Sequence, residues 1–242
     1  MSTVEKYYNE FYAEIAELDA KGNDFSKIQT ILPELSGNET FLDIGSGYGT
    51  VTEELIKRGF KVYAVETNKK AIDILRERGF IVYERDITKP LSINEKFDVV
   101  LLLDVLEHVF DPLFLLNEAK SVTKPEGYII ITVPLYFDIL DRLKILFTGS
   151  VISMDNLVYG EKIYKKFRSY NYDHIRFFRP KEVLEMGELL GLKVEKIEYV
   201  PTSYFGKSKL LKLLTKLIAN KYTVKLNPNL LAHSMRVRWR VK

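Results

Sequence analysis

The sequence of 242 residues contains no cysteine. This absence excludes disulfides, thiolate zinc sites and cysteine nucleophiles, and it fits a reducing compartment. Long apolar runs are missing too, because no stretch approaches the roughly 18 residues that a membrane-spanning helix needs. The first twenty residues are instead charged and polar at helical intervals. We therefore expect a cytoplasmic protein that is not inserted in a membrane.

The composition is that of a folded globular protein. Charged residues make up 29% and apolar residues 46% of the chain, which excludes disordered and collagen-like classes. The length suits one α/β domain with a small cover. We expect a single domain over 1–242, divided into an N-terminal helical cover (1–35), a core that carries the binding site (36–134), an insertion that covers the substrate (135–172) and C-terminal strands with a basic amphipathic helix (173–242).

Short β-branched runs alternate with longer helical patterns, which is typical of a parallel sheet. The pattern predicts an α/β fold with a doubly wound, mostly parallel seven-stranded sheet, helices on both faces and a small helical cover over the carboxyl edge. The predicted strands are 40–44, 61–65, 81–84, 97–103, 128–133, 192–200 and 234–241. The predicted helices are 51–58, 69–78, 112–124, 137–147, 179–190 and 207–220. Gly59, Gly79 and Gly127 follow helices where a left-handed cap is expected.

Charge is distributed unevenly along the chain. Residues 207–242 hold ten Lys or Arg and no Asp or Glu, whereas the other 206 residues hold 26 basic and 33 acidic side chains, a net charge of −7. The basic segment therefore faces something anionic: a phosphorylated substrate, a membrane surface, nucleic acid or the acidic body of the protein itself.

The strongest candidate for a binding site is the run FLDIGSGYG, in which a strand ends at Asp43 and passes through Gly45, Gly47 and Gly49 into a helix. Glycines allow a tight turn and a close ligand approach, and the helix N-terminus offers free N–H groups. Glu66 ends the next strand, where a carboxylate can accept both hydroxyls of an adenosine ribose. The dinucleotide fingerprint is not met, because its sixth position is Thr50, so an NAD-linked reductase is the weaker interpretation.

These motifs together resemble a class I S-adenosylmethionine-dependent methyltransferase with a Rossmann-like fold, of the type 11 or ubiquinone-biosynthesis-like branch. The resemblance covers roughly the first 200 residues and includes DVLEHVFDPLFLLNEAKSVTKPEGYIIITVP from Asp104 and HIRFFRPKEVLEMGELLGLKV from His174. It departs from the family at Glu126, where a glycine is usual, and at Glu66, where Asp is more frequent. It implies S-adenosyl-L-methionine as cofactor, bound by Asp43, Gly45, Ser46, Gly47, Gly49, Glu66, Thr67, Asp86, Ile87, Leu103, Asp104 and Tyr12.

Methyl transfer from a sulfonium is an in-line displacement that requires mainly correct positioning. A base is needed when the acceptor is a hydroxyl or a carbon acid. His108, just beyond the fourth strand, is the best candidate, and its alternative role is to shape the pocket. Asp104 borders the methionine part of the cofactor or caps the following helix.

Other polar and aromatic residues have two interpretations each. Glu107 lacks a second clustered ligand in the sequence pattern, so no metal site is expected. His174 fixes the insertion against the sheet or contacts substrate. Tyr12 belongs to an aromatic stripe that packs in the core, or it lends a hydroxyl to the cofactor carboxylate when the N-terminal helix closes over it.

The basic helix 207–220 carries leucines on one face and lysines on the other, without the acids of an ordinary surface helix. We expect a small-molecule or lipid-like acceptor, methylated on oxygen or carbon. Peripheral contact with an anionic membrane through 207–220 is one partner that this helix fits. Nucleic acid is disfavoured, because only Tyr222 and Trp239 interleave with the basic tail. A non-catalytic S-adenosylmethionine-binding module is the rival from another class.

Overall fold

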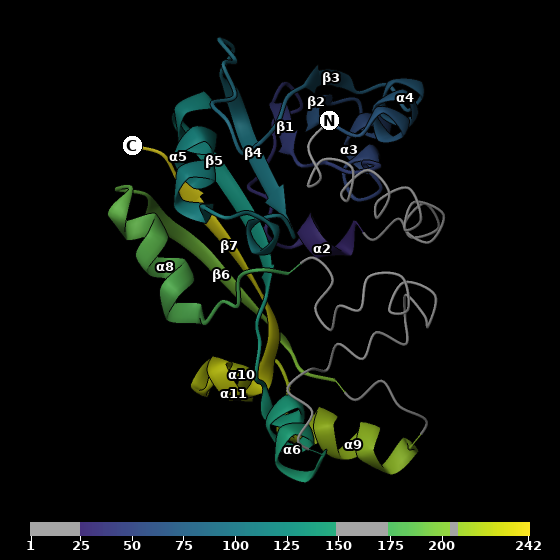
Figure 1. Ribbon diagram of the computed structural model, residues 1–242, viewed down its shortest axis with the longest axis vertical. Coiled ribbons are helices and arrows are strands. Elements are labelled where there is room, and N and C mark those ends of the chain that lie inside the picture. Colours follow the sequence, from purple (N-terminus) through teal and green to yellow (C-terminus); the bar gives the residue numbers. More distant parts are fainter. Residues whose placement is uncertain (1–24, 149–173, 204–207) are drawn as a thin grey trace.

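The structure is a computed structural model that describes residues 25–148, 174–203 and 208–242. Within these residues the chain forms one seven-stranded sheet (Figure 1). Its strands are β1 (Thr40–Ile44), β2 (Lys61–Glu66), β3 (Ile81–Glu84), β4 (Phe97–Leu103), β5 (Thr123–Pro134), β6 (Lys193–Pro201) and β7 (Ala232–Arg240).

The strand order is β3-β2-β1-β4-β5-β7-β6. The first five strands of this order are mutually parallel, and β7 runs antiparallel to both of its neighbours. The chain reverses its direction of winding between β1 and β4, which pair side by side. Open α/β sheets bind ligands at such a switch point, outside the carboxyl ends of the strands.

The helices of the described residues begin and end at recognisable signals. Asn68 caps the start of α4 by accepting the N–H of Ala71 at 3.1 Å, and Gly79 follows its end with φ +90°. Asp111 caps α5 by accepting the N–H of Phe114 at 2.9 Å. The helices are α2 (Ser26–Gln29), α3 (Glu53–Lys57), α4 (Lys69–Glu77), η1 (Leu106–His108), α5 (Pro112–Val122), α6 (Ile139–Thr148), α8 (Pro180–Leu189), α9 (Lys209–Ile218), α10 (Thr223–Leu226) and α11 (Pro228–Leu231).

Helices cover both faces of the sheet (Figure 1). On one face, fully buried Leu115 of α5 and Val183 of α8 pack against the strands in a single apolar cluster. On the other, Ile28 of α2, Leu55 of α3 and Leu75 of α4 pack together in a second cluster. The sheet is therefore buried on both faces, which explains its near-continuous apolar strands.

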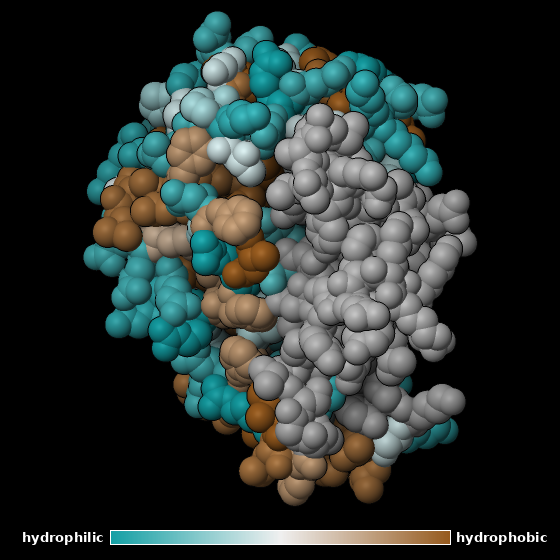
Figure 2. All heavy atoms as spheres, viewed as in Figure 1, coloured by the Kyte–Doolittle hydropathy of each residue, from teal (hydrophilic) through white to brown (hydrophobic). Residues whose placement is uncertain are grey.

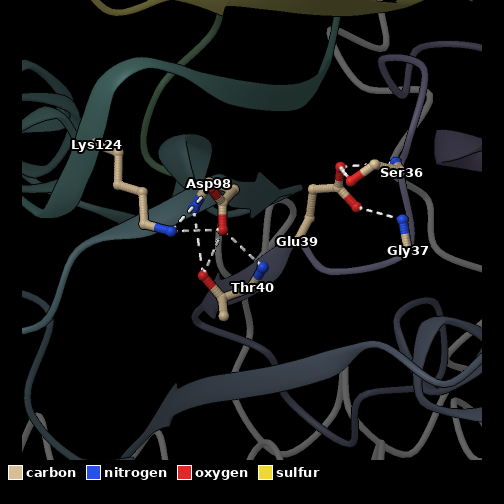
Figure 3. A network of polar contacts seen from close by, with 6 residues as sticks. All are labelled: Ser36, Gly37, Glu39, Thr40, Asp98 and Lys124. Carbon is tan, nitrogen blue, oxygen red and sulfur yellow. Dashed lines mark hydrogen bonds and ion pairs between the residues drawn. The ribbon is translucent and has the colours of Figure 1, made fainter.

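A polar network fixes the amino ends of β1 and β4 (Figure 3). The Asp98 carboxylate accepts the Thr40 N–H and hydroxyl, each at 2.8 Å, and the Lys124 ammonium at 2.8 Å. Beside it, Glu39 accepts the N–H and the hydroxyl of Ser36, each at 2.7 Å. The network lies at the edge opposite the strands' carboxyl ends, so we assign it to folding rather than to ligand binding.

The predicted α/β fold class and all seven strands are confirmed, with shifts of a few residues at their ends. The prediction for Gly127 is wrong. Glu126 takes the left-handed conformation, with φ 61°, and Gly127 lies inside β5. Glycine is needed there for a different reason, because a Cβ would lie 2.9 Å from the Asp98 carbonyl oxygen.

The helix predicted at 137–147 begins two residues later. Phe137 has φ 66°, and the Asp138 carboxylate accepts the N–H groups of Leu140 and Asp141 at 2.8 and 3.0 Å, so α6 starts after this cap. The later part of the expected insertion lies outside the described residues. In the part of the chain that the structure describes, no helix combines the length and apolar character needed to cross a bilayer.

Candidate active site

The glycine loop after β1 lies at the switch point of the sheet. Gly45, Gly47 and Gly49 all have positive φ, at +71°, +53° and +68°. The N–H of Gly45 donates to the Val65 carbonyl at 2.9 Å, which ties the loop to β2. All three positions therefore use the left-handed backbone that glycine adopts most readily.

The three glycines face different surroundings. A Cβ on Gly49 would lie 2.6 Å from Phe80 and 2.7 Å from Leu75, and a Cβ on Gly45 would lie 3.0 Å from Val105. At Gly47 a Cβ would meet no described atom within 4 Å. Gly49 and Gly45 are thus required by packing, whereas the backbone at Gly47 borders open space where a ligand could approach.

Glu66 closes the loop from the end of β2. Its carboxylate accepts the N–H of Gly47 at 3.0 Å, that of Thr67 at 2.7 Å and that of Asn68 at 2.9 Å. Burial raises the pKa of Glu66, although these three hydrogen bonds oppose the rise. A carboxylate has about four acceptor positions, so the three backbone hydrogen bonds leave at most one for a ribose hydroxyl.

Asp43 lies behind the loop rather than on its open side. The side chain is 3% exposed, and it accepts the Thr52 hydroxyl at 2.7 Å. Burial raises the pKa of Asp43 to about 7, with a further contribution from the charge of Glu66. In this structure Asp43 joins β1 to the helix after the loop.

Asp86 and Ile87 follow β3 on the same edge of the sheet. The Asp86 carboxylate accepts the Thr88 N–H at 2.9 Å and pairs with the Lys89 ammonium at 3.1 Å. Burial alone would raise the pKa of Asp86, but the bonds from Thr88 and Lys89 hold it below its usual value. Ile87 Cδ1 lies 3.7 Å from the position of a Cβ on Gly45. The structure thus brings Ile87 beside the glycine loop.

Asp104 follows β4 in a left-handed conformation, with φ 54°. Its carboxylate accepts the Thr132 hydroxyl at 2.7 Å and the Lys27 ammonium at 2.9 Å. Burial opposes ionisation, but Lys27 and Thr132 hold the pKa of Asp104 below its ordinary range. The alternative that Asp104 caps the next helix is wrong, because Asp111 performs that role. Lys27 was not found from the sequence, where nothing distinguishes it from other surface lysines.

His108 ends η1, next to His174 from a distant part of the chain. The two rings meet edge to face with centroids 4.7 Å apart. Backbone hydrogen bonds hold the two histidine segments together. The Glu107 carbonyl accepts the N–H of Ile175 at 2.8 Å and that of Arg176 at 3.1 Å. His108 Nε2 lies 3.9 Å from the Glu107 carboxylate.

The premise that Glu107 has no clustered partner is wrong. Ligand atoms of Glu107, His108 and His174 lie within 4.8 Å of one another, an arrangement that could hold a metal ion. Burial, aided by the neighbouring His108, lowers the pKa of His174 to about 4. His174 is therefore neutral near pH 7, and its Nδ1 shares a hydrogen bond with the Tyr136 hydroxyl. This bond connects the segment after β5 to the segment before α8.

The remaining predicted residues differ in how far the structure brings them to this edge. The Ser46 hydroxyl is buried and has no hydrogen-bond partner among the described residues. Thr67 is exposed and contributes its N–H to Glu66. Leu103 is half-buried at the end of β4. Tyr12 lies outside the described residues.

The edge as a whole fits an adenosine-containing cofactor. Residues from the ends of four parallel strands converge there, with an open backbone at Gly47, a carboxylate with acceptor capacity at Glu66 and a buried hydroxyl at Ser46. These are the donors and acceptors that a nucleoside with a short charged tail requires.

Comparison with known proteins agrees with this geometry. The family described as "Methyltransferase domain" matches residues 10–197. Ubiquinone biosynthesis O-methyltransferase of Aeromonas salmonicida is 27% identical over 172 residues, 67% of each chain. The enzyme of that name from Actinobacillus pleuropneumoniae is 25% identical over 168 residues, 65% of this chain and 67% of that one.

Solved structures share the fold. A SAM-dependent methyltransferase from Archaeoglobus fulgidus superposes with a TM-score of 0.63 at 19% identity, covering 95% of this chain and 99% of that chain. A putative methyltransferase in complex with the Haloferax volcanii methyltransferase activator Trm112 gives a TM-score of 0.64 at 13% identity, covering 99% of this chain and 97% of that chain.

Fold and site together define an S-adenosylmethionine-dependent methyltransferase with a Rossmann-like sheet. The chain belongs to the methyltransferase-domain family, whose match spans most of its length.

Proposed function

We propose that this enzyme methylates a hydroxyl oxygen of a small, lipid-like acceptor at the carboxyl edge of its sheet. The observation that carries the proposal is the position of His108, held between Glu107 and His174 directly beyond β4 and on the same edge as the glycine loop. A hydroxyl acceptor needs a base at this place, and imidazole supplies one near neutral pH.

The cofactor would be held by the residues already described. Glu66 would accept one ribose hydroxyl, Asp86 and Ile87 would hold adenine by its amino group and ring face, and the Gly47 backbone would border the chain of the methionine. Ser46, Leu103 and Asp104 would line the remaining sides. When bound, S-adenosylmethionine supplies an electrophilic methyl group.

His108 would then receive the proton of the acceptor hydroxyl on a ring nitrogen. His174 supports this role, because its depressed pKa keeps a second positive charge away from His108. Glu107 lies close enough to stabilise the imidazolium that forms, with 3.9 Å between its carboxylate and His108 Nε2.

Exposed aromatic side chains support an apolar acceptor. Phe110 is 70% and Phe177 44% exposed, and Phe177 stacks edge to face on Tyr136 at 4.8 Å, beside the histidine pair. The name of the curated relatives, ubiquinone biosynthesis O-methyltransferase, denotes methylation of oxygen in the making of a quinone lipid. We infer a related acceptor class for this chain.

The place of action follows from the acceptor class. A lipid-like acceptor resides in membranes, and residues 207–220 are the segment proposed to meet an anionic membrane from the cytoplasmic side.

A metal ion at Glu107, His108 and His174 is a second way to activate the acceptor hydroxyl, since a bound divalent cation also lowers the pKa of an oxygen ligand.

The test is methyl transfer from isotope-labelled S-adenosylmethionine. Phenolic and catecholic lipids in detergent should become labelled on oxygen, and amine analogues of the same shape should not. A chelator in a parallel reaction separates the base from the metal. Binding of S-adenosylmethionine with no label on any acceptor, including those of a cell extract, would leave a non-catalytic binding module, and tighter binding of NAD would favour the reductase.

A further inference from the structure

The basic C-terminal segment divides into two parts with different surroundings. In β7, Arg236 pairs with Glu198 at 3.7 Å, Arg238 with Glu195 at 3.6 Å and Arg240 with Glu126 at 3.2 Å. These arginines neutralise the acidic body of the protein. They therefore account for only part of the excess positive charge.

The lysines of α9 behave differently. Lys209, Lys212 and Lys216 are exposed, and none makes an ion pair with the residues that the structure describes. From 208 to 227 the sequence holds five lysines and no Asp or Glu. Among the residues that the structure describes, this stretch therefore presents positive charge that no acidic side chain pairs with.

The apolar face of α9 is also exposed. Leu210, Leu213 and Leu217 are 65%, 56% and 63% exposed, whereas the buried side chain of the helix is that of Thr215 at 8%. A surface helix normally buries its leucines and exposes its polar residues. Here α9 rests on the protein through its polar residue and turns its leucines outward.

Helix α6 adds a second apolar surface at the same end of the molecule (Figure 1). Leu146 and Phe147 are 73% and 79% exposed, and Figure 2 shows apolar side chains gathered at this end. The Arg142 guanidinium binds the Asn229 carbonyl at 3.3 Å, which joins α6 to α11. β5 ends at Pro134 on the carboxyl edge of the sheet, and α6 begins at Ile139. This end of the molecule therefore adjoins the edge that carries the candidate site.

We propose that the exposed faces of α6 and α9 form a docking surface for an anionic lipid bilayer. We call it the α6–α9 surface. Leucines and a phenylalanine beside uncompensated lysines are the two signals that interfacial helices combine, apolar burial and attraction to anionic headgroups. A second copy of the chain fits less well, because it would bring the same positive charge to the contact.

This inference rests on the proposed function only for its purpose, the collection of a lipid-like acceptor, and vesicle binding tests it without cofactor or acceptor. The full chain should bind vesicles of phosphatidylcholine and phosphatidylglycerol, and bind much less to phosphatidylcholine alone. Each lysine near an anionic surface contributes about a factor of five, so Lys209→Gln, Lys212→Gln and Lys216→Gln together should weaken binding about 100-fold. Salt should weaken wild-type binding as well.

The two apolar elements are tested separately. Leu213→Gln with Leu217→Gln, and Leu146→Gln with Phe147→Gln, should each reduce vesicle binding while the circular dichroism spectrum is unchanged. The matched controls lie elsewhere on the surface. Lys69→Gln, Lys70→Gln and Lys181→Gln together, and Leu189→Gln on α8, should leave vesicle binding as it is.

Equal binding to neutral and anionic vesicles, no binding at all, or equal losses in the control variants would overturn the proposal. So would a homodimer, seen by light scattering, that the leucine variants dissociate. Labelled methyl transfer to phenolic and catecholic lipids in detergent, without vesicles, is measured in parallel. Vesicle binding without methyl transfer removes the proposed function and leaves the α6–α9 surface, and methyl transfer without vesicle binding does the reverse.

Discussion

The hydroxyl of Thr52 donates a hydrogen bond of 2.7 Å to the buried carboxylate of Asp43, which connects β1 to the far side of the glycine loop. The pKa of Asp43 is raised from 3.8 to about 7, chiefly by burial. Between these two values the unfolded chain loses the proton that the folded protein keeps. The free energy of unfolding should therefore fall as the pH rises through this window.

Asp43→Asn removes this titration. We expect its free energy of unfolding to change less between pH 4 and 7 than that of wild type, whose loss proceeds at up to about 1.4 kcal/mol per pH unit. Denaturant titrations at several pH values in this range measure the free energy of unfolding of wild type and of Asp43→Asn. The Thr52 hydrogen bond lowers the Asp43 pKa, and Thr52→Val removes that bond. In this variant the free energy of unfolding should therefore continue to fall to a higher pH than in wild type. Parallel curves for wild type and Asp43→Asn would assign the raised pKa to another group.

Glu66→Ala should weaken binding of S-adenosylmethionine, because the lost acceptor leaves a ribose hydroxyl unpaired, at about 1 to 3 kcal/mol or more. It also removes the acceptor of the Gly47 N–H. Calorimetry measures the affinity. Glu66→Gln is the control, since it keeps the size of the side chain and part of its acceptor capacity. Its affinity for S-adenosylmethionine should lie between those of wild type and Glu66→Ala. An affinity of Glu66→Ala within about twofold of wild type would remove Glu66 from the site.

Gly49 and Gly47 have similar backbone angles but different surroundings, which separates strain from packing. Alanine at either position incurs about 1–2 kcal/mol for a left-handed conformation. At Gly49 the methyl group would also overlap Phe80 and Leu75, which adds about 1–3 kcal/mol. Gly49→Ala should therefore lower the unfolding midpoint more than Gly47→Ala. Gly47→Ala should instead show its larger effect on cofactor affinity, and equal midpoints would contradict the packing argument.

The sequence was sufficient to predict the parallel sheet, because its central strands are buried on both faces and read as near-continuous apolar runs such as 97–103. The position of Glu66 beside the glycine loop could be predicted for the same reason, since it ends a strand and the carboxyl ends of parallel strands meet at one edge. Ile87 was proposed from the family resemblance, and the structure brings it beside the same loop.

Contacts between distant segments could not be predicted in this way. Lys27 and Asp104 are 77 residues apart, and nothing in their spacing predicts an ion pair. His174 approaches His108 because the N–H groups of Ile175 and Arg176 both donate to one carbonyl, a detail of backbone geometry rather than of residue type. The error at Gly127 has a related origin, since a Cβ there would meet the Asp98 carbonyl of β4 as well as Thr123 and Lys124 of its own strand.

The last prediction concerns catalysis by His108. If its imidazole takes the acceptor proton, His108→Ala should lower kcat by about 10²-fold or more and leave cofactor affinity nearly unchanged. His174→Ala is the comparison, because it removes the neighbouring ring and should have a smaller effect on kcat. A role in packing predicts the opposite pattern, with loss of stability or cofactor binding and little loss of turnover per folded molecule. Activity that a chelator abolishes and a divalent metal restores would instead make Glu107, His108 and His174 a metal site, and His108→Ala would then reduce metal affinity together with kcat.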